Sequence, residues 1–142
     1  MASGIDLPRR SALVPLVVAE ARSSSVIAWF SRQEDTPIIS DLANLEVSAV
    51  VSRSLRAGRL TRRQVQSALL DFDAIRANCE RLSHSMADFA HAERLIRDFA
   101  TKLAAPDALH LASAKNSGAA LATFDARLAD AARAQGVEVA LG

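Results

Sequence analysis

Cysteine and aromatic residues are scarce in this sequence. A single cysteine, Cys79, stands among 142 residues, which excludes an internal disulfide framework and a cysteine-based zinc site. Aromatic residues make up only 4% of the chain and tyrosine is missing. Few flat side chains are therefore available as platforms for stacking single-stranded bases.

Long apolar runs and glycine-rich motifs are also missing. No apolar run approaches the roughly 18 residues that a membrane-spanning helix needs. The first residues lack the basic-then-apolar order of a secretory signal. Neither GxGxxG nor GxxxxGK[ST] is present, which weakens a dinucleotide-binding or P-loop interpretation. These absences predict a soluble cytoplasmic protein.

Apolar material for one core is plentiful. Half of the residues are hydrophobic, which excludes a disordered chain, and this length suits one domain without an internal boundary. The charges nearly balance, with 17 basic and 16 acidic side chains. Their total alone does not exclude nucleic acid, because the distribution of charge decides. Nearly all the basic residues are arginines, which suit phosphates, although a GC-rich genome also produces Ala- and Arg-rich chains.

Periodicity predicts helices that alternate with short strands. Apolar spacing, N-caps such as Thr61, and Gly58 and Gly118 as stops predict helices over residues 11–33 (broken near 21–25), 42–57, 61–78, 85–100, 106–116 and 126–135. Strands are expected at 36–40, 79–82, 119–124 and 137–141. The alternation predicts an α/β fold with a short, mostly parallel sheet, whose sites lie at the carboxyl ends of the strands.

The same spacing predicts which side chains face inward. For the 42–57 helix the expected apolar stripe is Leu42, Leu45, Ala49 and Val50. For the 85–100 helix the residues expected to face the core are Met86, Phe89, Ala90, Leu95 and Phe99.

Four acidic residues stand where a site could form. Asp41 and Asp125 each follow a predicted strand, Asp107 lies in a first helical turn, and Glu46 shares a largely apolar helix face. An acid on such a face needs a partner or a metal ion. Each position has an ordinary alternative, since Asp caps helices, an acid in the first turn complements the helix dipole, and Glu46 could pair with Arg53.

Longer strings around these acids resemble one known family. PDALHLASA and the later ALATFDARLADAA resemble the C-terminal half of PIN-domain proteins. ISDLANLEVSAVVSRSLRAGRLT resembles their strand–helix element with its glutamate, and SALVPLVVAEARS resembles their first helix. The resemblance covers nearly the whole chain and is strongest to VapC-type toxins of type II toxin–antitoxin systems. It implies one three-layer α/β/α sandwich over residues 1–142, with residues 1–10 atypical.

The resemblance also implies a function, that of a Mg²⁺-dependent endoribonuclease. Glu46, Asp107 and Asp125 match the family's metal-binding and catalytic acids, and Thr123 is the threonine often found beside the last. Together they would hold Mg²⁺ or Mn²⁺, which prefer oxygen ligands, and a metal-activated water would hydrolyse RNA phosphodiester bonds. Such proteins are usually homodimers, inhibited by a VapB-like antitoxin peptide in the active-site groove.

The chain departs from the family at its beginning. The family's first acid precedes the Ser of its SAL motif by two residues, a position held here by Arg9, and the apolar strand before it is missing. Asp6 could replace that acid only if residues 7–9 bulge. A cation in the pocket would compete with a metal ion for the remaining acids. The alternative function is therefore a catalytically impaired PIN-fold protein that binds an antitoxin or RNA.

The remaining polar residues allow bland interpretations. His110 is interpreted as a packed or hydrogen-bonding residue rather than a metal ligand or base, and His84 and His91 show no partner pattern. Cys79 is interpreted as a small buried hydrophobe. Five arginines within eleven residues predict either an RNA phosphate-tracking surface or a solvated helix end: Arg53, Arg56, Arg59, Arg62 and Arg63.

Overall fold

The computed structural model describes residues 28, 32 and 36–140, and all structural statements concern these residues. The order of elements is β1 (Ile38–Ser40), α2 (Asp41–Arg56), α3 (Arg62–Ala77), β2 (Glu80–Leu82), α4 (Met86–Arg97), α5 (Ala105–Ser117) and α6 (Ala126–Ala134). The two strands pair in parallel, as predicted. Apart from residues 28 and 32, the helices expected over residues 11–33 lie outside the described residues, as do Asp6 and Arg9.

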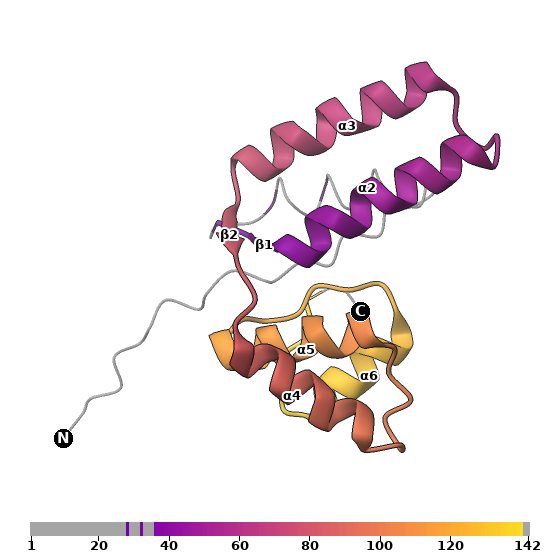
Figure 1. Cartoon of the computed structure of the whole chain (residues 1–142). Helices are drawn as coiled ribbons and strands as arrows, with labels where there is room; N and C mark the ends of the chain where they lie inside the picture. The colour runs from indigo at the N-terminus through magenta and orange to yellow at the C-terminus, as the bar shows by residue number, and fades with distance from the viewer. Residues whose placement is uncertain (1–27, 29–31, 33–35, 141–142) are drawn as a thin grey trace.

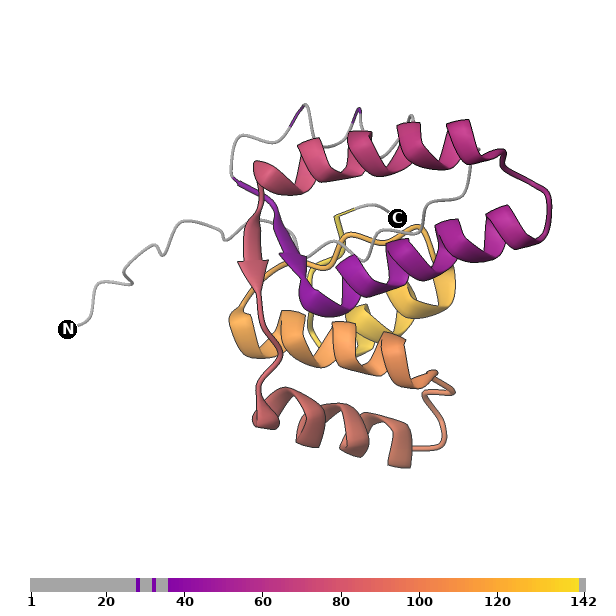
Figure 2. The same cartoon turned by 45° about the horizontal axis from the view of Figure 1, so that its top comes forward.

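The helices cover the strands from two sides (Figures 1 and 2). An antiparallel hairpin of α2 and α3 lies on one side, and α4, α5 and α6 lie on the other. Ile38 packs into the core beneath α4 and α5, whereas its neighbour Ile39 packs into the core beneath α2 and α3. Leu121 and Ala122 divide between the two cores in the same way. Adjacent residues of an extended chain point to opposite faces, so the predicted three-layer α/β/α arrangement is confirmed.

Local capping explains where the helices begin and end. The Ser40 hydroxyl accepts a hydrogen bond from the Ala43 N–H at 3.0 Å at the start of α2. Thr61 with Gln64, and Ser85 with Asp88, form capping boxes that begin α3 and α4. Gly118 ends α5 at φ 71°, a left-handed conformation that favours glycine. No helix in the described part of the chain combines the length and apolarity that crossing a membrane requires.

The last two predicted strands are shorter than expected. Residues 119–124 and 137–141 contribute one parallel bridge, Leu121 with Val139, instead of two full strands. The Ala119 N–H bonds to the Ala114 carbonyl of α5 at 3.0 Å, and the Val137 N–H bonds to the Ala132 carbonyl of α6 at 2.9 Å. The first backbone N–H group of each segment thus bonds to the end of the preceding helix. Only a short stretch of each segment therefore remains for strand pairing.

Two predicted helix faces were wrong in part, although Leu95 is buried as predicted and Leu42 packs against the core. On α2 the buried residues are Ala43, Val47 and Val51, and Leu45 is exposed. On and just after α4, Met86 is 90% exposed and Phe99 is 85% exposed, and Phe89 is also exposed. These apolar side chains lie on the surface because α5 covers only the face of α4 that carries Ala92 and Leu95.

Candidate active site

Helix α5 carries two of the residues that matter here. All residues from 108 to 114 are buried. Asp107 lies in the first turn of α5, half-buried, and His110 follows one turn later with only 1% of its surface exposed. The inner position of α5 therefore fixes both side chains against the core.

Glu46 reaches α5 from the middle of α2. His110 Nε2 bonds to Glu46 Oε1, although the two residues are 64 positions apart in the sequence. His110 Nδ1 is buried and has no hydrogen-bond partner among the described residues. The interpretation of His110 as a packed, hydrogen-bonding residue is confirmed. Arg53, the alternative partner, makes no ion pair with Glu46; His110 holds that carboxylate instead.

Asp125 begins α6 as its N-cap. Its Oδ1 atom accepts hydrogen bonds from the N–H groups of Arg127 at 2.9 Å and Leu128 at 3.3 Å. The buried Thr123 hydroxyl accepts a hydrogen bond from the Asp125 N–H at 3.0 Å, which orders the chain just before the helix. The ordinary capping role is therefore present, and it also fixes where this carboxylate stands.

The electrostatics of Asp107 link the three acids. Burial raises the pKa of the Asp107 carboxyl, the negative charge of Asp125 raises it further, and Glu46 acts in the same direction. His110 and Arg127 partly oppose these effects. The structure thus brings Glu46 from α2 and Asp125 at the start of α6 near enough to Asp107 on α5 that both of their charges act on its carboxyl.

The three acids have the carboxylate oxygens that a divalent cation prefers as ligands. Their side chains are not placed as a metal-binding group in the described structure. Among the residues that the structure describes, no three His, Cys, Asp or Glu side chains stand close enough to hold a metal ion. Mutual repulsion between carboxylates is what a hard cation relieves, and Mg²⁺ binds to few carboxylates while keeping several waters. Glu46, Asp107 and Asp125 therefore match such an ion in the chemical type of their oxygen ligands.

A buried polar network that the sequence did not reveal joins α2, α4 and α5. The Leu42 N–H donates to His84 Nε2 at 3.3 Å, so His84 Nδ1 carries the proton and donates to the Ser113 hydroxyl at 2.8 Å. Ser113 in turn donates to Asp88 at 3.1 Å, and the Asn116 amide donates to its other oxygen at 2.8 Å. No local pattern marks these partners, because His84 is 29 and 42 residues from them.

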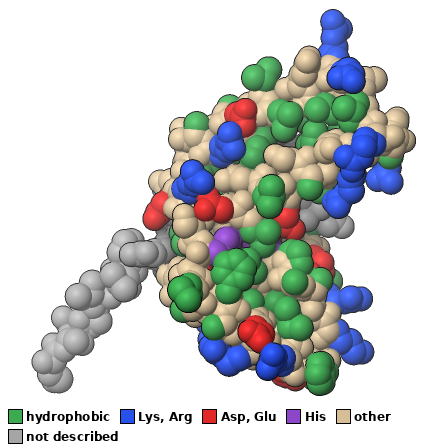
Figure 3. Space-filling view, viewed as in Figure 1, with side chains coloured by type: hydrophobic (Ala, Val, Ile, Leu, Met, Phe, Trp, Pro, Cys, Tyr) green, Lys and Arg blue, Asp and Glu red, His purple; other side chains and the backbone are tan. Residues whose placement is uncertain are grey.

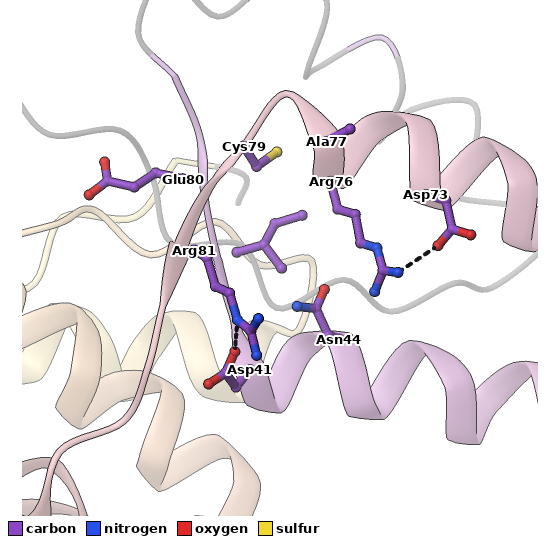
Figure 4. A pocket seen from close by; sticks show the side chains of 9 residues that line it. Asp41, Asn44, Asp73, Arg76, Ala77, Cys79, Glu80 and Arg81 are labelled. Atoms are coloured by element: carbon purple, nitrogen blue, oxygen red, sulfur yellow. Dashed lines mark hydrogen bonds and ion pairs between the residues drawn. The ribbon is translucent and has the colours of Figure 1, made fainter.

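Asp41 is occupied elsewhere. It is the first residue of α2 rather than its cap, and it forms an ion pair with Arg81 of β2 at 2.5 Å, which lowers the pKa of Asp41. Both residues line a cavity of about 600 Å³ between the strands and the α2–α3 hairpin (Figure 4). Asp73 and Arg76 form a second ion pair at its wall. The cavity does not include Glu46, Asp107 or Asp125, and its two arginines are ion-paired with two of its three acids.

The same cavity contains Cys79. Burial raises the pKa of its thiol to about 11, and Sγ donates to the Ile75 carbonyl at 3.3 Å. Thiolate nucleophilicity at neutral pH is therefore not available. The interpretation of Cys79 as a packing residue is confirmed in part, since it is half-buried rather than fully buried.

The five clustered arginines are all exposed at the turn that joins α2 to α3. Arg53 and Arg56 lie in the last turn of α2, and Arg62 and Arg63 lie at the start of α3. Blue side chains gather at this end of the hairpin in Figure 3. Within the described part of the chain none of the five forms an ion pair with an acid, so their charge is available to a partner.

Comparisons with known proteins complete the description. A sequence model of the PIN domain matches residues 10–134. No curated protein matches the chain at a significant level.

Three solved structures share the fold. The crystal structure of PAE2754 from Pyrobaculum aerophilum has a TM-score of 0.66 at 17% identity and covers 98% of this chain and 92% of its own. FitAcB from Neisseria gonorrhoeae has a TM-score of 0.64 at 19% sequence identity, and the match covers 90% of this chain and 95% of that chain. The structure of VapBC2 from Rickettsia felis, bound to a DNA fragment from their promoter, has a TM-score of 0.61 at 16% sequence identity. The match covers 92% of this chain and 97% of that chain.

Proposed function

Because the chain belongs to the PIN-domain family, we propose that it is a nuclease toxin of the VapC type that uses Mg²⁺ or Mn²⁺ to hydrolyse RNA phosphodiester bonds. The observation that carries this proposal is that a sequence model of the PIN domain matches residues 10–134, and the raised pKa of Asp107, caused by burial and by the charges of Asp125 and Glu46, supports it. Glu46, Asp107 and Asp125 come from three separate elements, and they stand at the sequence positions that match the family's acids. Such an activity fits a cytoplasmic protein.

In this proposal Glu46, Asp107 and Asp125 hold the cation. When bound, the cation supplies charge neutralisation at the phosphate and a more acidic water. Asp125 stands at a fixed place because its capping hydrogen bonds hold one carboxylate oxygen. Asp107 stands on a helix that is packed on all sides. The chain's contribution is thus to hold carboxylates together at the cost of their repulsion.

The exposed arginines extend this proposal to the substrate. Arg53 follows Glu46 by seven residues, which is two turns and about 10 Å along α2 on the same side of the helix. A phosphate chain that reaches Glu46 could therefore continue toward Arg53, Arg56 and the start of α3. Binding through such contacts falls steeply as salt is raised.

A homodimer is proposed from the apolar surface of α4. Met86 and Phe89 are exposed and precede Ala92 and Glu93 in the sequence. Ile96 and Phe99 are exposed and follow these two residues at the same sequence spacings. A two-fold axis at that point would set Met86 against a second copy's Phe99, and Phe89 against its Ile96. In Figure 3 apolar side chains gather over this lower part of the molecule. Phe89→Glu should convert the dimer to a monomer in sedimentation experiments, and a monomeric wild type would contradict the interface.

An antitoxin is the further partner proposed, by analogy with the VapBC2 and FitAcB structures, which share the fold. A VapB-like segment that occupies the site would cover Glu46 and Asp107. Co-expression of this chain with the product of the adjacent gene tests the idea. Copurification that is lost in a site variant supports it, whereas independent elution of the two proteins contradicts it.

The test of the nuclease proposal is cleavage of RNA with added Mg²⁺ or Mn²⁺. Glu46→Gln and Asp107→Asn should each abolish the cleavage that EDTA also abolishes. Asp130→Asn is the matched control, because this exposed α6 residue pairs with Arg133 at 3.5 Å and, in the part of the chain that the structure describes, with no other residue. A wild type that remains inert with both metals would refute the catalytic part.

A second candidate function rests on the same site. Glu46 is bonded to His110, Asp125 caps a helix, and in the described region the acids form no group ready to hold a metal ion. Together with Arg9 at the sequence position of the family's first acid, these facts favour a catalytically impaired protein that binds an antitoxin or RNA. Such binding should survive EDTA, whereas a partner held through the cation would be released.

A further inference from the structure

The cavity between the strands and the α2–α3 hairpin has in its wall a buried polar atom without a hydrogen-bond partner. Asn44 of α2 lines this cavity, and Figure 4 shows its amide group directed into it. The Asn44 Oδ1 atom is buried and accepts no hydrogen bond from any described residue. Buried carbonyl oxygens in folded proteins are nearly always hydrogen-bonded, because leaving one unpaired costs free energy. The cavity wall therefore contains an acceptor that suits a donor on a bound molecule.

Two ion pairs stand on the same wall as Asn44. Arg81 Nε bonds to Asp41 Oδ1 at 2.5 Å, and Arg76 Nη2 bonds to Asp73 Oδ1 at 3.2 Å. A guanidinium group has five N–H donors, and each of these contacts engages a single nitrogen of the arginine. The aspartates thus hold the two arginines in place and leave most of their donors for a ligand.

The charges that surround Asn44 balance. A third acid, Glu80, also lines the cavity, but its carboxylate is directed away from Asn44 and Arg76 in Figure 4. The other charged groups of the wall are two arginines and two aspartates. A simple anion or cation therefore meets repulsion as well as attraction, whereas a molecule that carries both charges finds a partner for each. The cavity volume of about 600 Å³ lies within the range of small-molecule sites.

We propose that this cavity binds a small zwitterion of the amino-acid type. The ammonium group of the ligand donates to Asn44 Oδ1 and to a neighbouring aspartate, and its carboxylate accepts from Arg76 or Arg81. None of the three acids of the proposed nuclease site lines the cavity. The inference therefore does not rest on the proposed function, and the two can fail independently.

The test is a titration of the ¹⁵N-labelled full chain, followed by the NMR signals of the Asn44 side-chain amide. The probes are the standard amino acids, added one by one, with acetate, methylammonium and inorganic phosphate as ions of one charge. At least one amino acid should shift these signals saturably, and the single-charge ions should not. If no amino acid shifts them, or if phosphate alone does so, the inference is overturned.

Two variants and a control locate the binding. Asn44→Leu keeps the side-chain volume and removes the unpaired acceptor, so the variant should fold as well as wild type without a probe. Amino-acid binding, followed in the variants by the backbone amide signal of Ala77 on the cavity wall, should be lost in Asn44→Leu. Arg76→Gln should weaken binding about tenfold or more, as the loss of a charge-assisted hydrogen bond does. Arg133→Gln, at an exposed arginine of α6 outside the cavity, should leave the affinity unchanged. Wild-type affinity in Asn44→Leu would contradict the site.

Discussion

Helices α5 and α3 are similar in length but occupy opposite environments. α5 has seven consecutive buried residues and packs against both α4 and α6. Of the α3 residues, Phe72 alone is buried, and among the described helices α3 packs mainly on α2. Asp107 and His110 lie on the inner helix, whereas three of the clustered arginines lie at or just before the outer one. The fold thus places Asp107 and His110 on a helix whose packing holds them in position, and it places the arginines on the surface where a partner can reach them.

The largest difference between the two helices should appear when a leucine is truncated. Leu111 on α5 is 0% exposed and Leu70 on α3 is 70% exposed. Leu111→Ala removes buried apolar contacts and leaves a cavity, so it should cost about 2–5 kcal/mol of unfolding free energy. Leu70→Ala should change it by less than about 0.5 kcal/mol. Urea denaturation measures both, and equal losses would show that the inner and outer helices are not distinct.

The polar network gives the next largest effect. Ser113 accepts from His84 and donates to Asp88, so Ser113→Ala leaves the half-buried His84 and the buried Asp88 without this partner. The expected loss is about 1–3 kcal/mol. Ser67→Ala, at an exposed position of α3, is the matched control and should be nearly neutral. A neutral Ser113→Ala would mean that water replaces the hydroxyl.

These contrasts also show what the sequence can reveal. Caps at Thr61, Ser85 and Gly118 act over three or four residues, so the helix boundaries followed from local chemistry. The exposed faces of α2 and α4 did not, because Leu45 and Met86 fit the apolar periodicity as well as core residues do. Only the tertiary arrangement decides which of two adjacent apolar stripes is covered.

The site was predictable to a different degree. Glu46, Asp107 and Asp125 were proposed through family resemblance, and each alone also had an ordinary structural explanation. The bonds of His84 to Ser113 and of His110 to Glu46 join residues 29 and 64 positions apart. One sequence contains no periodic pattern that links such positions. Long-range polar contacts therefore had to come from the structure.

His84 makes the inner layer sensitive to acid. Burial lowers the pKa of His84, and His110 adds to the effect, while Asp88 and Asp41 oppose it. Since the unfolded chain then takes up a proton first, stability should be full above about pH 6.5 and fall as the pH drops toward the lowered folded pKa. His84→Gln should flatten this part of a melting-temperature profile between pH 7 and 5.5. A profile identical to that of wild type would contradict the assignment.

The smallest effect is expected at Asp107, and its sign distinguishes a site from a structural acid. Burial and the charges of Asp125 and Glu46 raise the pKa of Asp107 above its ordinary 3.8. Its ionised form therefore opposes folding, so the contribution of Asp107 to stability is highest below pH 3.8 and declines as the pH rises through the folded pKa. Without a divalent cation, Asp107→Asn should melt slightly higher than wild type at pH 7. Adding Mg²⁺ should stabilise the wild type by mass action and the variant much less, which reverses the order of their melting temperatures.

Asp73→Asn on α3, where the acid pairs with Arg76 at the surface, should show no such reversal. If Mg²⁺ leaves the order unchanged, the repulsion at Asp107 is a cost of packing and not of cation binding.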